Sequence, residues 1–173
     1  MPREESLSVA PSRAGAPPRA LVGLYLELGK ARLSALVVVT AVVGFLVATP
    51  RPPEWSALIA VTAGTFLLAA GANGLNQWLE ADRDARMDRT RNRPLPSGRM
   101  TPRHAFGASL AAVALGAAVT LAGDNRLTAV LGALNVAIYV LVYTPLKPVT
   151  PVNTLIGAVC GAIPPMMGWA AAR

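Results

Sequence analysis

Long apolar runs alternate with short polar stretches along this chain. Five windows contain no Asp, Glu, Lys, Arg or His: Leu33–Pro50, Trp55–Leu79, Ala105–Gly123, Leu127–Leu146 and Pro148–Ala172. Each window is as long as, or nearly as long as, the ~20 residues that a helix needs to cross a bilayer. The pattern therefore predicts an all-α fold, a polytopic bundle of about five transmembrane helices.

Prolines and polar residues set the expected ends of these helices. We expect helices at about Leu33–Ala48, from Trp55 into the polar stretch after residue 79, at Ala105–Ala122, at Leu127–Tyr143 and from Asn153 onward. Asn153 is a suitable N-cap, and the adjacent Pro164 and Pro165 predict a kink or a break. Residues 85–103 form a basic loop, because two prolines and a glycine between residues 94 and 98 interrupt any regular element.

The N-terminal segment differs in composition from the rest of the chain. Residues 1–20 hold four prolines and three arginines, and such a segment buries too little apolar surface to fold. We therefore predict a flexible cytoplasmic tail over residues 1–25. Residues 26–173 are then expected to be the N-terminal part of a truncated transmembrane domain, because five helices with an apolar ending suit part of a larger bundle.

The basic residues are unevenly distributed between the predicted loops. Residues 1–32, 80–104 and 147–152 hold thirteen of the sixteen Lys and Arg residues, and alternating helix directions put these three segments on one side. Lys and Arg collect in cytoplasmic loops, so we predict a multi-pass protein of the cell (inner) membrane with its N-terminus and acidic motif in the cytoplasm. The same rule explains the net charge of +7, and we expect no nucleic-acid partner.

Chemistry-bearing residues concentrate where the second apolar window ends. Residues 76–93 hold four acids and five arginines. At 3.6 residues per turn, Asn76, Glu80 and Asp84 share one stripe of a helix. Asp82 lies about 240° from Asn76, and Asp88 joins the stripe only if the helix ends or bends. Oxygen ligands in this pattern favour Mg²⁺, whose shell is usually completed by water and substrate phosphates.

A plainer explanation exists for each of these charges. The acids suit a solvated helix end with ordinary salt bridges, and the arginines of residues 83–103 suit lipid headgroups. Lys30 and Arg32 precede the first apolar window, and Tyr143 and Lys147 follow the fourth. Each of these four is either an interface anchor or a contact for phosphate. The pattern by itself leaves both possibilities open.

Several blocks of the sequence resemble one family, the intramembrane aromatic prenyltransferases. Asn76–Asp84 is similar to its first acidic motif, N-x-x-x-D-x-x-x-D, and Met87–Leu95 is similar to the form found in members that farnesylate haem B. The blocks Lys30–Ala41, Tyr143–Lys147 and Asn153–Trp169 agree with the same members. The resemblance extends over about residues 22–172. It departs from the family at Glu80, where Asp is commoner, and at Pro148, where a basic residue is often found.

The resemblance implies a fold, a reaction and a set of partners. The fold is a bundle of nine helices, of which about five are present here, with a second acidic motif between helices 6 and 7. The reaction transfers a farnesyl group from farnesyl diphosphate to a vinyl group of haem B with Mg²⁺ as cofactor, giving haem O for haem A biosynthesis. Haem A synthase and oxidase assembly factors are candidate protein partners, and the lipid bilayer is the medium.

The resemblance also assigns roles to residues. Asn76, Glu80 and Asp84 are expected to be catalytic and to hold the metal, with Asp88 as a candidate fourth ligand. The diphosphate is expected to contact six further residues: Lys30, Arg32, Arg89, Arg93, Tyr143 and Lys147. Two rivals stay open. One is a prenyltransferase of this fold that acts on a quinone precursor or another aromatic acceptor, and the other is an inactive membrane fragment.

Overall fold

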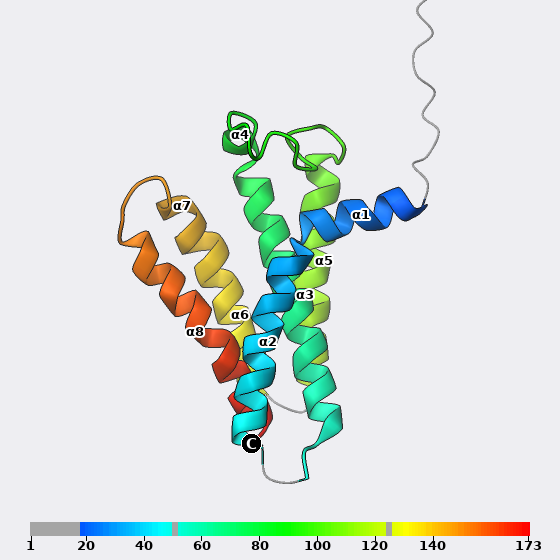
Figure 1. The fold of residues 1–173 in the computed structure, drawn as a ribbon, viewed down its shortest axis with the longest axis vertical. Helices are drawn as coiled ribbons and strands as arrows, with labels where there is room; N and C mark the ends of the chain where they lie inside the picture. The colour runs from blue at the N-terminus through cyan, green and yellow to red at the C-terminus, as the bar shows by residue number, and fades with distance from the viewer. Residues whose placement is uncertain (1–17, 50–51, 124–125) are drawn as a thin grey trace, which may run out of the picture.

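The computed structural model describes residues 18–49, 52–123 and 126–173 (Figure 1). These ranges contain helices and no strand: α1 (Pro18–Leu28), α2 (Ala31–Ala48), α3 (Trp55–Leu79), α4 (Ala81–Asp84), α5 (Pro102–Ala122), α6 (Arg126–Ala137), the π-helix η1 (Ile138–Tyr143), α7 (Thr144–Leu146) and α8 (Asn153–Ala171). The predicted all-α fold is therefore confirmed.

Five of the helical segments are long and apolar enough to cross a membrane. They are Ala31–Ala48, Trp55–Leu79, Pro102–Ala122, Arg126–Leu146 and Asn153–Ala171, with mean hydropathy between 1.4 and 2.2. The chain is a multi-pass membrane protein. α3 packs against α5 on one side and α2 on the other, and α8 packs against both α2 and α6. A core at the lower half of the bundle includes Phe45, Val61, Leu68 and Met167.

The polar segments gather at one end of the bundle (Figure 1). α4, the loop of residues 85–101 and α7 lie at this end, and α1 crosses it. The end of α2, the start of α3, the end of α5 and the start of α6 lie at the opposite end, with the C-terminus. The segments that we predicted to share a side therefore do so where they are described. Their cytoplasmic orientation stays a prediction.

Glycines let two pairs of helices approach closely. A Cβ atom at Gly168 of α8 would overlap the carbonyl oxygen of Ala41 in α2. On the other side of the bundle, a Cβ at Gly116 of α5 would lie 2.8 Å from the backbone nitrogen of Leu68 in α3. Small residues at such crossings are typical of membrane helices, where close backbone packing drives association. These contacts hold α8 against α2 and α5 against α3.

The predicted flexible tail is wrong for its last part. Residues 18–25 belong to α1, whereas residues 1–17 lie outside the described ranges. The helix forms because its apolar residues find partners: Leu28 is buried with Leu95 and Met100, and Leu24 packs beside them. Proline in the first turn of a helix, here Pro18, is no obstacle.

Two details of the last helices also differ from the expectation. Val152, not Asn153, is the N-cap of α8, and no side chain caps this end. We expected a kink or a break at Pro164 and Pro165, and there is no break, because α8 continues to Ala171. Prolines are tolerated inside membrane helices when neighbouring helices hold their path, and here Pro164 is buried in the bundle.

Candidate functional site

The side chain of Asn76, near the end of α3, is the centre of a polar cluster. Its Oδ1 accepts a hydrogen bond from Lys30 Nζ at 2.9 Å. Its Nδ2 donates to Glu80 Oε2 and to Thr144 Oγ1, each at 3.1 Å. Asn76 itself is buried. One amide thus joins the start of α2, the end of α3 and the start of α7.

Two ion pairs complete the cluster. Lys147 Nζ lies 3.2 Å from Glu80 Oε1, and Arg93 Nη1 lies 2.6 Å from Asp84 Oδ2. The side chain of Asp84 is 2% exposed and that of Arg93 is 22% exposed. The basic loop is held to the acidic motif as well, because Thr90 Oγ1 donates to the carbonyl oxygen of Asp84 at 2.9 Å. Three cations therefore face two buried carboxylates.

Asn76, Glu80 and Asp84 share one face although the helix is interrupted between α3 and α4. α3 ends at Leu79, and Glu80 has φ −94° and ψ 3° between α3 and α4. The Glu80 amide still donates to the Asn76 carbonyl at 3.0 Å, and the Asp84 amide to the Glu80 carbonyl at 2.8 Å. Both bonds have the spacing of an α-helix, so the three side chains stay on one inward face. Asp82 is exposed, as its helical angle predicted.

Lys30 reaches the cluster from an unusual backbone conformation. Its φ of 47° and ψ of 56° lie in the left-handed region, which costs a residue with a Cβ about 1–2 kcal/mol. Burial, followed by the positive charge of Arg93, lowers the pKa of Lys30 from 10.5 to about 8. A strained backbone and a destabilised charge at one residue are typical of a functional site.

The structure brings together only some of the residues singled out from the sequence. Lys30, Arg93 and Lys147 lie in the cluster with the three motif residues. Arg32 and Arg89 are exposed and, within the described ranges, form no hydrogen bond or ion pair with the cluster. The side chain of Asp88 is 95% exposed and pairs with Arg91 at 3.3 Å. Of the acids in this motif, Glu80 and Asp84 are the two that point inward.

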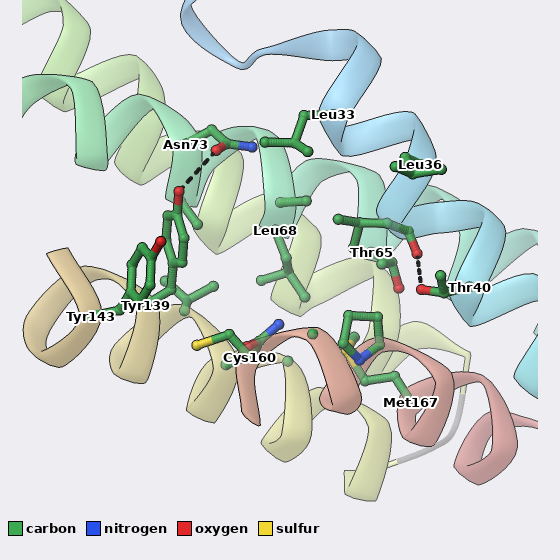
Figure 2. Close-up of a pocket in the computed structure, with 18 of the residues that line it drawn as sticks. Leu33, Leu36, Thr40, Thr65, Leu68, Asn73, Tyr139, Tyr143, Cys160 and Met167 are labelled. Carbon is green, nitrogen blue, oxygen red and sulfur yellow. Dashed lines mark hydrogen bonds between the residues drawn. The ribbon is translucent and has the colours of Figure 1, made fainter. Parts of the chain in front are cut away.

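An apolar cavity of about 340 Å³ adjoins the cluster (Figure 2). Leu33, Leu36, Leu68 and Met167 are among its apolar lining residues. The cavity lies between α2, α3, η1, α6 and α8, and Tyr143 lines it directly before Thr144 of the cluster. A polar head and an apolar tail of one ligand can therefore be bound side by side.

Reading the sequence missed several residues that shape this cavity. Asn73 lines it one turn before Asn76 and links two helices, since it donates to Ser34 Oγ at 3.2 Å and accepts from Tyr139 Oη at 3.3 Å (Figure 2). The Tyr139 and Tyr143 rings stack with centroids 5.2 Å apart. Both lie in η1, and π-turns occur frequently at functional sites. In the sequence, the one indication of a role for Asn73 was its polar amide within an otherwise apolar helix.

The donor set suits Mg²⁺ only with help from a ligand. Within the described ranges, no three His, Cys, Asp or Glu side chains are close enough to form a metal site by themselves. Glu80 and Asp84 offer carboxylate oxygens, the ligands that Mg²⁺ prefers, and Mg²⁺ commonly uses one or two carboxylates plus phosphate oxygens. The Asn76 oxygen already accepts from Lys30. The residues fit a metal that arrives with a diphosphate.

Comparison with known proteins identifies the class of this integral membrane protein. Residues 37–173 match the model of the UbiA prenyltransferase family, and the chain belongs to that family. Relatives named protoheme IX farnesyltransferase share 47% identity in Arabidopsis thaliana and 43% in Homo sapiens, over 86% and 88% of this chain. One from Myxococcus xanthus is 51% identical over 84% of the chain. The chain spans 35%, 34% and 49% of these relatives' lengths.

Solved structures have the same fold. One, described as "Structural and mechanistic insights into the biosynthesis of Digeranylgeranylglyceryl phosphate synthase in membranes", has a TM-score of 0.80 at 20% identity, over 88% of this chain and 53% of that one. A UbiA homolog from Archaeoglobus fulgidus, bound to GPP and Mg²⁺, has a TM-score of 0.70 at 19% identity, over 86% of this chain and 52% of that one. At such identities the likeness concerns the fold alone.

Proposed function

We propose that this chain forms the diphosphate-binding half of a protohaem IX farnesyltransferase, which transfers a farnesyl group from farnesyl diphosphate to a vinyl group of haem B. The observation that carries the proposal is the cluster of three cations and two buried carboxylates beside an apolar cavity. The names of the curated relatives support haem B as the acceptor.

The cations bind the head of the donor substrate. Lys30, Arg93 and Lys147 each contact one residue of the acidic motif, and their charges attract the diphosphate oxygens. Glu80 and Asp84, with Asn76 in support, would hold Mg²⁺, which would supply further positive charge where the leaving diphosphate becomes more negative. The hydrogen bonds and ion pairs within the cluster hold these side chains close to one another before the substrate arrives. The farnesyl chain occupies the apolar cavity.

Carbon–carbon bond formation follows loss of the diphosphate. The allylic C–O bond breaks with its electron pair on the diphosphate, and the vinyl π electrons attack the allylic carbon. Water adds to the new cation beside the porphyrin ring and loses a proton, which gives the hydroxyethylfarnesyl group. The apolar lining, with residues such as Leu33 and Leu68, excludes water from the allylic cation until the acceptor attacks.

The site assignment is tested by two substitutions with the same change in charge. In liposomes that contain the protein, Asp84→Asn should weaken Mg²⁺-dependent binding of farnesyl diphosphate by at least about 10–100-fold, the loss typical of impaired metal ligation. Asp82→Asn, at an exposed position two residues away, should bind as the parent does. Equal losses in the two variants would contradict the assignment.

The acceptor is tested by the product. In cells that lack haem O synthase, a longer protein that carries these residues and a second acidic motif should yield haem O on haem extraction and chromatography. Residues 1–173 alone should insert into membranes but yield none, because one acidic motif contacts the diphosphate from one side only. Prenylation of a quinone precursor or a chlorophyll-type ring instead of haem would favour the rival acceptor. Haem O from residues 1–173 alone would disprove the need for a second half.

The polar end is proposed to face the cytoplasm, where its basic residues would follow the distribution seen in other membrane proteins. The test uses single cysteines in a background with Cys160→Ala. Ser97→Cys, in the basic loop, and Glu54→Cys, in the connection before α3, are exposed positions at opposite ends of the bundle. A membrane-impermeant thiol reagent outside intact cells should label Glu54→Cys alone. Labelling of Ser97→Cys instead would reverse the proposed orientation.

A further inference from the structure

Helix α1 differs in direction from the membrane-spanning helices. It crosses the polar end of the bundle at a steep angle to α2, α3 and α5 (Figure 1). With 11 residues it is about 16 Å long, too short to span a bilayer. It therefore lies along the surface that the spanning helices reach, rather than across the membrane.

Two polar contacts fix the angle of α1. Arg99 Nη1 and Nη2 donate to the two carboxylate oxygens of Glu27 at 2.8 and 2.9 Å. Tyr25 Oη and His104 Nε2 lie 2.6 Å apart. The first contact binds one edge of α1 to the basic loop, and the second binds it to the first turn of α5. Both contacts are solvent-exposed, and they therefore contribute little to the free energy of folding. Their main effect is on the orientation of α1.

Exposed aromatic residues give the depth of α1. The Trp78 and Phe106 rings are in tilted contact at the polar end with ring centroids 4.9 Å apart, and Trp55 is exposed at the other end. Trp55 and Trp78 are separated by about 35 Å of helix, slightly more than the hydrocarbon thickness of a bilayer. Aromatic side chains at this spacing mark the two interfaces. His104, the partner of Tyr25, precedes Phe106 by only about 3 Å of helix, so α1 lies at the depth of the interface.

The outer face of α1 is apolar and about half exposed, and Tyr25 on this face also bonds to His104 through its hydroxyl. Four side chains, each between 43% and 59% exposed, form this face: Leu21, Val22, Tyr25 and Leu26. They span about 140° of the helix. α1 is followed directly by α2, a membrane-spanning helix that begins at Ala31. Arg83, Arg86, Arg89 and Arg103 are exposed at the same end, which favours anionic headgroups.

We infer that α1 is an interfacial helix, with the face formed by Leu21, Val22, Tyr25 and Leu26 inserted into the boundary between headgroups and acyl chains of an anionic bilayer. Its edge at Glu27 stays bound to the basic loop on the water side. Because α1 ends two residues before Lys30, the lipid surface also holds the corner from which Lys30 reaches the site. The inference does not depend on the proposed reaction.

The test measures whether water or lipid acyl chains contact each face of α1. In a Cys160→Ala background, Val22→Cys is the probe and Gly23→Cys is its matched control, about 100° further round the helix. Nothing lies within 4 Å of an added Cβ at Gly23, so the control is tolerated. Each variant is labelled with a small environment-sensitive fluorophore and placed in vesicles of phosphatidylcholine and phosphatidylglycerol. Quenching is compared between aqueous iodide and nitroxide groups on the acyl chains.

The label at Val22→Cys should lose its fluorescence to the acyl-chain nitroxide and be protected from iodide. The label at Gly23→Cys should behave in the opposite way. If iodide quenches both labels, α1 lies in water and the inference is wrong. If neither quencher reaches the label at Val22→Cys, protein covers this face, and a second copy or another segment replaces lipid as the partner. Leu26→Cys repeats the test one turn along the same face.

Discussion

Replacing Gly168 by Ala should separate α8 from α2. The added Cβ would overlap the carbonyl oxygen of Ala41 and lie 2.7 Å from the backbone nitrogen of Phe45. Neither atom belongs to a side chain that can rotate away, so the two helices must move apart. Overpacking of this kind typically costs about 1–3 kcal/mol.

Gly161→Ala, in the same helix, is the matched control. Nothing lies within 4 Å of a Cβ at this position. Both variants gain the same helix propensity, about 1 kcal/mol for Gly to Ala, so the difference between them isolates the clash. We expect Gly168→Ala to have a free energy of unfolding about 1–3 kcal/mol lower than that of Gly161→Ala.

The measurement is unfolding in mixed micelles by titration with a denaturing detergent, followed by circular dichroism. The quantity compared is the difference in unfolding free energy between the two variants, in which errors of extrapolation to zero denaturant largely cancel. Equal unfolding free energies for the two variants would show that α2 and α8 are not in backbone contact at Gly168.

Two further predictions concern the charges of the site. Arg93→Met leaves the buried carboxylate of Asp84 without its partner and should lower the free energy of unfolding by about 3–5 kcal/mol. The control, Arg91→Met, breaks a solvent-exposed pair and should lower it by less than about 1 kcal/mol. Similar losses in the two variants would contradict the burial of the Arg93–Asp84 pair. Without divalent cations, binding of farnesyl diphosphate should weaken as the pH rises through about 8, where Lys30 loses its charge in the free protein, by up to about tenfold per pH unit for one proton taken up. Lys30→Arg stays charged and should remove this dependence in a titration by calorimetry, and an unchanged pH profile would argue against contact between Lys30 and the diphosphate.

The spacing of residues along the chain determined the spanning helices. A run of about 20 uncharged, apolar residues has no lower free-energy state in a bilayer than a helix, because its backbone groups must bond internally. The window beginning at Leu33 therefore predicted α2 to within two residues, and the window beginning at Trp55 predicted the start of α3. α3 ends at Leu79 and does not continue through the acidic motif as expected. Spacing also determined that Asn76, Glu80 and Asp84 share a face, because that relation depends only on the helical repeat.

The partners of these residues were decided by the tertiary structure. Asn76 meets Lys30 across 46 residues of chain, and Glu80 meets Lys147 across 67, and no local periodicity encodes such distances. Arg89 and Arg93 both belong to the basic loop, and the sequence offers no reason to prefer one of them as a partner of Asp84. In the described residues Arg93 pairs with Asp84 and Arg89 does not, because the fold of the loop turns Arg93 inward. The same holds for α1, most of whose residues the sequence assigned to a flexible tail. It is ordered by Leu95 and Met100, which lie about seventy residues further along the chain and become its neighbours only when the bundle forms.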